Sequence, residues 1–379
     1  MSFYGENNLF SFRDNICEQI TKEPLTVSQL AEFGSKVNFN GKIIAVGFES
    51  DMLKSYAYSL ASGIAQQGCN VIITENAVLP AFICGLNKIS VSYGLYISSA
   101  NPLIIQIYNG FGVPCPSEFL LSNSKKEKNC SNIGKISSYL HINELYLNEI
   151  HNSFENNTKM NAGISCGNKS IINIWSDFFA DNSDEIILQI SQCGTKVNMY
   201  SSETGFISHE KLMLAYALNL MKNKENPALP ENIHFIAQEL AEKHNCKITK
   251  GGSDYNSIIL KQRFTIDPLF LCIQLLNKID SFYELCSEIP DFYTAKREFS
   301  TEYFDLFAEK TIIDNNGRIK ISNSGKKRIT LTAQAYNAET AAELCCFWQN
   351  KINSLSHSYR IYSALRTDIH SKLGTAECK

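Results

Sequence analysis

The segment Ser98-Ser99-Ala100-Asn101-Pro102, which is followed by Tyr108-Asn109-Gly110, could supply a hydroxyl nucleophile. It comes at the end of an apolar run, residues 94–97, which is typical of a buried strand. Small residues and a proline predict a turn directly after that strand. A serine on a loop that a sheet holds can carry a phosphoryl group, so Ser99 is the candidate catalytic residue. The alternative is a turn without a chemical role, because serine is common in turns.

A second segment that could do chemistry is a basic turn between two predicted strands, residues 318–321 and 328–335. The small residues Ser324 and Gly325 favour a tight turn whose backbone N–H groups can face an anion. The turn is therefore a candidate phosphate-binding site, to which positive charge is added by Lys326, Lys327 and Arg328. A basic hairpin turn without a ligand is the alternative interpretation.

Composition narrows the classes of protein to which the chain can belong. Its 379 residues, 44% of them hydrophobic, suffice for roughly two to four domains with substantial cores. The net charge of −3 predicts neither nucleic acid nor an anionic membrane as a partner. The chain lacks an apolar run of about 18 residues and a signal-peptide pattern, so we expect it to be soluble. Thirteen cysteines without paired spacing favour a reducing compartment, and hence the cytoplasm.

The order of predicted elements indicates an α/β protein. Strands are expected at residues 42–47, 70–74 and 95–97, with a helix over 53–67 and a short helix near Ala81, which is typical of a parallel α/β layer. Further along the chain we expect helices over 146–154, 171–179, 209–222, 239–243, 269–279 and 338–352, and strands at 185–190 and 247–249. Turn-rich segments and changes of pattern divide the chain into the four domains 1–140, 141–226, 227–289 and 290–379.

This order of parts resembles that of the α-D-phosphohexomutase superfamily, which includes phosphomannomutases, phosphoglucomutases and phosphoglucosamine mutases. Residues 99–102 and 108–110 are similar to the family's Ser-His-Asn-Pro and Tyr-Asn-Gly segments, and residues 321–329 fall where the family has its phosphate-binding loop. The resemblance covers nearly the whole chain. It implies four domains: three related α/β domains, of which the second and third are shortened here, and a C-terminal α+β domain.

The resemblance also implies a phosphoserine at Ser99, a magnesium ion held by three aspartates, and a loop that contacts the sugar. The expected metal loop, residues 191–196, instead has Ser191, Cys193 and Thr195 at the ligand positions. Neutral hydroxyls and a soft thiol do not suit Mg²⁺, so we predict a degenerate metal loop and no bound cofactor. The nearest carboxylates that could substitute belong to Asp181, Asp184 and Glu203.

Other family features are missing as well. Ala100 replaces the histidine that follows the serine, and residues 254–264 lack the glutamate and histidine of the sugar-contact loop. Phosphoryl transfer depends chiefly on electrostatic stabilisation, and these losses would remove several of its sources together.

Three hypotheses about function follow. The first is a degenerate phosphohexomutase-like protein without mutase activity, which retains phosphosugar or phosphate binding, or a regulatory role with a protein partner. The second is an active, divergent phosphosugar mutase that uses Ser99 and a Mg²⁺ ion held by relocated ligands. The third is an interaction module whose shortened middle domains expose a docking surface. The sequence does not decide between binding and interaction.

Overall fold

The computed structural model describes residues 9–37, 39, 41–116, 132–154, 159–180, 185–277, 279–300, 310–314, 317–323 and 328–355. The chain forms two compact units. The first contains Met1–Ile233 and Leu240–Ile289, and the second contains His234–Glu239 and Pro290–Lys379. The finer division into four domains stays a prediction.

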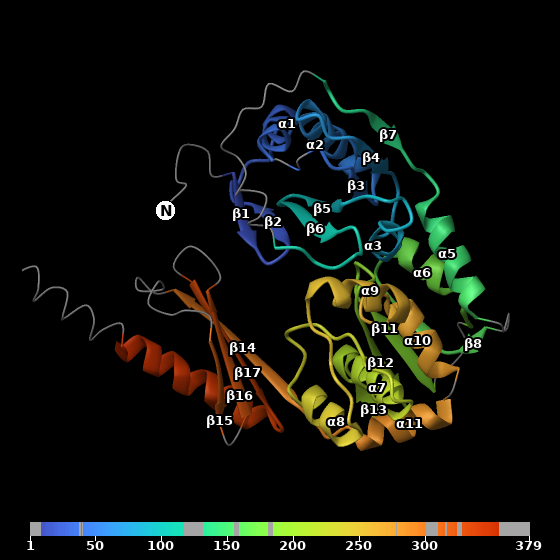
Figure 1. The fold of residues 1–379 in the computed structure, drawn as a ribbon, viewed down its shortest axis with the longest axis vertical. Helices are drawn as coiled ribbons and strands as arrows, with labels where there is room; N and C mark the ends of the chain where they lie inside the picture. Colours follow the sequence, from blue (N-terminus) through green and yellow to red (C-terminus); the bar gives the residue numbers. More distant parts are fainter. Residues whose placement is uncertain are drawn as a thin grey trace, which may run out of the picture. The chain divides into compact units, whose positions relative to one another are not determined.

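The first unit begins with a seven-stranded sheet in the order β1-β2-β6-β5-β3-β4-β7 (Figure 1). Its strands are β1 (Phe10–Arg13), β2 (Ile16–Gln19), β3 (Ile44–Phe48), β4 (Val71–Thr74), β5 (Tyr93–Ala100), β6 (Leu103–Asn109) and β7 (Ile136–Ser138). The strands β3, β4, β5 and β7 run parallel, as the alternation of strands and helices predicts, and β6, β2 and β1 extend the sheet antiparallel.

Helices cover both faces of this sheet, which explains why every residue of β3 is buried. On one face, Val46 joins a core with α1 (Val27–Lys36) and α2 (Lys54–Gln66). On the other, Ala45 joins a core with α3 (Leu79–Gly85) and α5 (Ile142–Ser153). The carboxyl ends of β3, β4 and β5 therefore meet at one edge, between the two helical layers.

A second, four-stranded sheet has the order β13-β12-β11-β9. Its strands are β9 (Gly163–Ser165), β11 (Ile186–Ile190), β12 (Val197–Ser201) and β13 (Gly205–Ile207), and a separate two-stranded pair joins β8 (Met160–Asn161) to β10 (Phe179–Ala180). The residues of β11 alternate between buried and exposed. This pattern shows that one face of the sheet packs on the core while the other is open to solvent.

Helices complete the first unit. They are α6 (Lys169–Trp175), α7 (His209–Lys222), α9 (Gly252–Gln262), α10 (Pro268–Leu276) and α11 (Ile279–Glu288), while α8 (Ile236–His244) begins in the second unit and ends in the first. The helices α10 and α11 both pack on α7. The predicted helix over 209–222 is confirmed, whereas α11 is an additional helix that the periodicity did not predict.

The strand predicted at residues 247–249 was wrong. Thr249 makes only an isolated bridge with Ala228, and no strand lies between residues 227 and 277, a stretch whose backbone the structure describes throughout. Directly after this bridge, Gly251 and Gly252 have φ angles of +66° and +81° and lead into α9. A ladder cannot lengthen where the chain turns away into a helix, because each further pair needs an extended partner.

The second unit contains the antiparallel sheet β14-β17-β16-β15, formed by β14 (Tyr293–Ser300), β15 (Lys310–Asp314), β16 (Gly317–Asn323) and β17 (Arg328–Ala335). A helix over residues 338–355 follows β17. Its start is confirmed, because Asn337 Oδ1 accepts the N–H of Thr340 at 2.7 Å, as an N-cap does. One face of the sheet packs on this helix through Leu331, Leu344, Ile352 and their neighbours.

None of the helices among the described residues is both long and apolar enough to cross a membrane.

Candidate functional site

Ser99 lies at the tip of the β5–β6 hairpin. Its neighbour Ala100 pairs with Leu103, and a bulge between Ile97 and Ser99 interrupts the ladder. The side chain of Ser99 is half-buried, and its Oγ accepts the N–H of Asn101 at 3.3 Å. The predicted turn is therefore confirmed, and the hydroxyl hydrogen of Ser99 is not used in this contact.

The loop that follows β11 brings the three other predicted site residues of this unit together. Ser191 Oγ lies 3.5 Å from Cys193 Sγ, and Cys193 Sγ lies 3.0 Å from Thr195 Oγ1. Ser191 Oγ also accepts the N–H of Lys196 at 3.1 Å. The side chains at the expected ligand positions thus satisfy one another by hydrogen bonding.

These contacts alter the acidity of the exposed Cys193 thiol. Partial burial of the sulfur raises the pKa, but the hydrogen bonds from Ser191 and Thr195 outweigh that effect, so the pKa of Cys193 is lower than usual. A thiolate is favoured where hydroxyl groups can donate to it.

The loop is held against the first sheet by tight packing and by one polar side chain. Gly194 has a φ of +73°, and a Cβ at this position would lie 2.6 Å from Ile171 Cδ1 and 2.9 Å from Pro80 Cγ. Asn168 Nδ2 donates to the carbonyl oxygen of Gln192 at 3.0 Å and to Glu49 Oε2 at 3.1 Å. Because Glu49 directly follows β3, Asn168 connects the loop to the carboxyl edge of the first sheet.

Two tyrosines of the first sheet face the same region. Burial raises the pKa of Tyr96 well above its usual value, and the negative charges of Glu49 and Cys193 raise it further. Burial likewise raises the pKa of Tyr108, with a smaller contribution from Cys193. The hydroxyl of Tyr96 donates to the carbonyl oxygen of Ala77 at 2.9 Å. Both tyrosines are therefore neutral.

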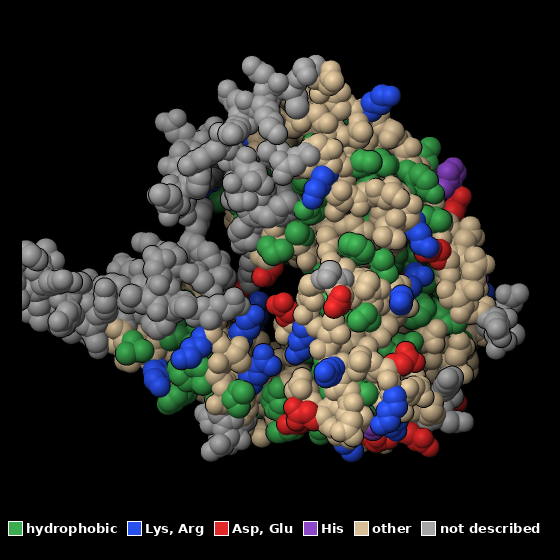
Figure 2. Space-filling model, viewed as in Figure 1, with side chains coloured by type: hydrophobic (Ala, Val, Ile, Leu, Met, Phe, Trp, Pro, Cys, Tyr) green, Lys and Arg blue, Asp and Glu red, His purple; other side chains and the backbone are tan. Residues whose placement is uncertain are grey.

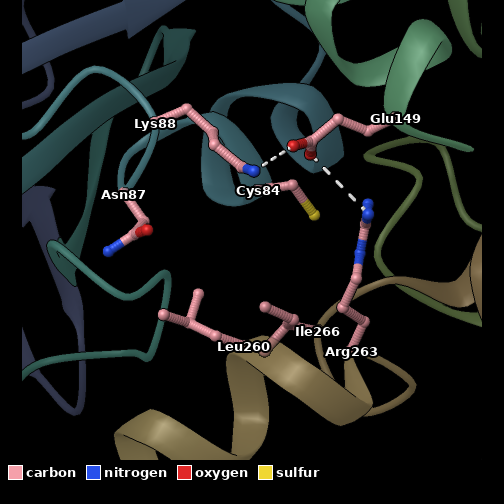
Figure 3. Close-up of a pocket in the computed structure, with 7 residues that line it drawn as sticks. All are labelled: Cys84, Asn87, Lys88, Glu149, Leu260, Arg263 and Ile266. Carbon is pink, nitrogen blue, oxygen red and sulfur yellow. Dashed lines mark ion pairs between the residues drawn. The ribbon is translucent and has the colours of Figure 1, made fainter. Parts of the chain in front are cut away.

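Residues 254–264, where the resemblance places the sugar-contact loop, mostly form α9. Arg263, directly after this helix, belongs to an ion-pair network (Figure 3). Arg263 donates to Asp267 at 2.8 Å, and its guanidinium lies 3.6 Å from the carboxylate of Glu149. Glu149 also pairs with Lys88. Beside these groups is a cavity of about 70 Å³. The network joins α3 and α5 to α9 and α10, and its charges are already paired.

Of the predicted phosphate-binding turn, Ser324, Gly325, Lys326 and Lys327 lie outside the described residues. Arg328 is exposed, begins β17 and pairs with Ser300 of β14.

Solved structures resemble this arrangement over most of its length. One, from Thermus thermophilus, is named a phosphomannomutase. The structural match includes 92% of this chain and 100% of that protein's chain, with a TM-score of 0.63 and 10% sequence identity. Another, a phosphoglucomutase/phosphomannomutase family protein from Burkholderia thailandensis, covers 90% of this chain and 97% of its own, with a TM-score of 0.61 and 11% identity.

The fold is that of the phosphohexomutases. This confirms the predicted fold class, a mixed α/β protein with several sheets. By sequence, neither a protein-family model nor a curated protein matches the chain.

The loop after β11 does not fit the magnesium ion that the phosphohexomutase resemblance implies. Mg²⁺ prefers hard oxygen ligands, usually carboxylates, whereas this loop offers two neutral hydroxyls and a soft sulfur. Among the residues that the structure describes, no three His, Cys, Asp or Glu side chains are grouped so that they could hold a metal.

The substitute carboxylates do not provide a site in the described part of the chain. Glu203 lies in the turn after Ser201, which pairs with Ile186 at the start of β11. It is therefore separated from Ser191 by the length of β11, roughly 15 Å for a strand of this size. Asp181 and Asp184 lie outside the described residues.

Sequence reasoning missed the role of two residues next to this loop. Asn168 was noticeable only as part of an Asn-Lys-Ser glycosylation pattern, although an asparagine before an apolar helix is also an N-cap signal. Cys166 follows β9 and donates to the carbonyl oxygen of Ser191 at 3.6 Å. Its place beside the loop depends on strand pairing, for which a single sequence carries little signal.

Proposed function

We propose that this chain is a phosphohexomutase-fold protein that binds a phosphorylated sugar, or a similar phosphate-bearing anion, and does not carry out the mutase reaction. The observation that carries the proposal is the hydrogen-bonded set of Ser191, Cys193 and Thr195, which occupies the loop where carboxylates would be needed. Transfer of a phosphoryl group requires positive charge near its oxygens. An ionised Cys193 would add negative charge instead.

Retained anion binding is supported by the fold and by the charges of the second unit. The two solved structures with this fold carry mutase names, so the fold is one that accommodates sugar phosphates. Thr332 of β17 pairs with Lys296 of β14 on one side and with Lys320 of β16 on the other. Arg318 precedes Lys320 by two residues in β16 and so lies on the same face of the sheet. Figure 2 shows Lys and Arg side chains gathered over the second unit. Cations on a sheet face attract anions without a metal.

The first experiment is a mutase assay with glucose 1-phosphate or mannose 1-phosphate, a bisphosphate primer and Mg²⁺. We expect turnover at the no-protein background, and calorimetry without stoichiometric Mg²⁺ binding. We expect the sugar phosphates to raise the melting temperature equally with and without Mg²⁺.

A variant with Ser191→Asp, Cys193→Asp and Thr195→Asp should gain Mg²⁺ binding. The matched neutral control carries asparagine at the same three positions and should not.

Mutase turnover that depends on Mg²⁺ would contradict the proposal and favour the active enzyme. In that case intact-mass analysis should show a stable phosphate that is lost in Ser99→Ala. The control is Ser98→Ala, because Ser98 is the exposed neighbour on the same hairpin.

A second candidate function, interaction with another protein, is favoured by an exposed row of apolar side chains. Ile187, Tyr200 and Phe206 are 37%, 54% and 63% exposed, and they pair directly across β11, β12 and β13. Such a row is typical of an interaction surface. Sugar phosphates that leave the melting temperature unchanged, with or without Mg²⁺, would favour this role over anion binding.

A further inference from the structure

Two thiols lie at the carboxyl edge of the second sheet. Cys166 directly follows β9, and Cys193 lies in the loop after β11. The two strands are parallel neighbours, with Ser165 paired to Gln189. Parallel neighbours end at the same edge of a sheet, so these cysteines are neighbours in space although 26 residues separate them in the sequence.

Both sulfur atoms contact the same residue. Cys166 Sγ lies 3.6 Å from the carbonyl oxygen of Ser191, and Cys193 Sγ lies 3.5 Å from its Oγ. The same carbonyl oxygen accepts the N–H of Gly194 at 2.8 Å, which closes a tight turn around Cys193. The two sulfurs therefore lie on either side of Ser191, and a bond between them requires a shift of this turn.

The two thiols are chemically unlike. Cys193 is exposed and lies within hydrogen-bond distance of two hydroxyls that can donate to its thiolate, so the thiolate is accessible and can be stabilised. Cys166 is half-buried and its thiol donates to a carbonyl oxygen. By contrast, Cys17, Cys84 and Cys272 are buried, and burial raises the pKa of each. An attacking thiolate beside a protonated partner is the arrangement that redox-sensitive pairs use.

We propose that Cys193 and Cys166 form a reversible dithiol–disulfide pair, with Cys193 as the thiol that is oxidised first and Cys166 as the thiol that resolves it. The oxidant is a hydroperoxide. The Cys193 thiolate attacks the peroxide oxygen, the O–O bond breaks, and the leaving alkoxide or hydroxide takes up a proton, so that Cys193 becomes a sulfenic acid. The Cys166 sulfur then attacks the Cys193 sulfur, the S–O bond breaks, and one water molecule leaves. A thiol reductant then reduces the disulfide by exchange: one reductant thiolate attacks it to form a mixed disulfide, a second reductant thiol releases the protein sulfur, and both cysteines return to thiols while the reductant leaves as its own disulfide.

Oxidation would alter the connection between the two sheets. Cys166 Sγ accepts the N–H of Asn168 at 3.4 Å, and Asn168 in turn joins the loop to Glu49. A disulfide would pull Cys166 towards Cys193 and away from this contact. The redox state of the pair would thereby be sensed at the carboxyl edge of the first sheet.

Trypsin offers a direct test, because Lys159, Lys169 and Lys196 place the two cysteines in separate peptides, 160–169 and 170–196, with one cysteine each. The reduced full-length chain is treated with a small excess of hydrogen peroxide, blocked with an alkylating reagent and digested without reductant. We expect a peptide pair whose mass is the sum of the two peptides less two hydrogen atoms. Added thiol reductant should restore both peptides.

Variants separate the roles of the two thiols. Cys166→Ser should abolish the crosslink and leave Cys193 as a sulfenic acid that a dimedone probe traps, whereas Cys193→Ser should abolish both signals. The matched control is Cys246→Ser, because Cys246 is also half-buried and its thiol also contacts a backbone carbonyl oxygen. It should crosslink like the native chain. Before oxidation, every variant should melt as cooperatively as the native chain.

In the native chain, Cys193 should be labelled by iodoacetamide on the order of tenfold faster than Cys246, because Cys193 is exposed and two hydroxyls beside it can donate to its thiolate. Two results would overturn the proposal: oxidised native chain without the 160–169/170–196 pair, or a dimedone signal that persists in Cys193→Ser. Either result leaves the proposed anion binding untouched, since that is measured in reductant.

Discussion

Asn168 shows how much a single side chain can contribute to this site. Its Oδ1 accepts the N–H groups of Ser170 and Ile171 at 2.9 and 3.4 Å, which caps α6. Its Nδ2 donates both to Glu49 and to the loop after β11. An aspartate could cap the helix equally well but has no amide hydrogens to donate. The amide therefore serves the fold and the site together.

His234 is a residue whose burial leads to a pH-dependent stability. It is fully buried, and its Nδ1 accepts the N–H of Ile236 at 3.3 Å, which requires the neutral ring. Burial lowers the pKa of His234 from 6.5 to about 4. In the unfolded chain the ring takes up a proton near pH 6.5, whereas in the folded chain it does so only near pH 4. The unfolded state binds more protons in this window, so stability is lost as the pH falls through it.

We expect the free energy of unfolding to fall by about 2 kcal/mol between pH 7 and pH 5 because of His234. Urea unfolding at both pH values checks this. In His234→Gln this share of the loss should be absent, at the cost of lower stability at pH 7, while the share from His209 remains, because burial lowers its pKa to about 4 as well. His141→Gln is the control, because the side chain of His141 is exposed, and it should keep the native pH dependence. An equal loss in His234→Gln and the native chain would show that this histidine is not responsible.

At the scale of elements, α1 and α2 pack through glycines. A Cβ at Gly34 would lie 2.6 Å from the carbonyl oxygen of Leu60, and one at Gly63 would overlap the carbonyl oxygen of Ala31. The two helices make direct backbone contact at this crossing, which places α2 close enough to β3 and β4 to cover one face of the first sheet. Even a methyl group would force the helices apart.

Gly63→Ala should therefore lower the free energy of unfolding by about 1–3 kcal/mol, although alanine favours a helix more than glycine does. Chemical denaturation measures the loss. The control is Ser62→Ala, one residue earlier on the exposed side of α2, which should be neutral or slightly stabilising. A stabilised Gly63→Ala protein would mean that the helices can separate without cost.

At the scale of the whole molecule, the chain has separate cores in its two units. The core of the second unit is built from Leu331, Ile329 and Leu344, with the helix over residues 338–355 on one face of its sheet. Two cores of the first unit lie on the two faces of the seven-stranded sheet, and a smaller one includes α9. Because the cores share no residue, each unit should respond to its own substitutions.

Leu331→Ala should destabilise the second unit by about 2–5 kcal/mol, since Leu331 is fully buried. Hydrogen exchange should become faster in β14, β16 and β17 while the amides of β3 and β5 keep their protection. Leu60→Ala, in the core of the first unit, should give the opposite pattern. Faster exchange in both units from either substitution would show that they unfold together.

Much of the fold was predictable because periodicity and turn chemistry are local. The helix over 209–222 and the strand near 186–190 have strong patterns, and the serine turn at Ser99 follows from its small residues and proline. The failures have a common cause. Residues 247–249 have strand-forming side chains, but a strand also requires a partner, and the two glycines that follow direct the chain into α9.

The sequence by itself determined which chemical groups stand at the three expected ligand positions of the loop after β11: two hydroxyls, one thiol and no carboxylate. Only the tertiary structure decided what those groups do. Pairing of β9 with β11 brings Cys166 to Ser191, and Asn168 connects the same loop to Glu49. The physical reason is that ligand preference belongs to the atoms a residue carries, whereas hydrogen bonds and thiol proximity depend on distances that only the folded chain sets.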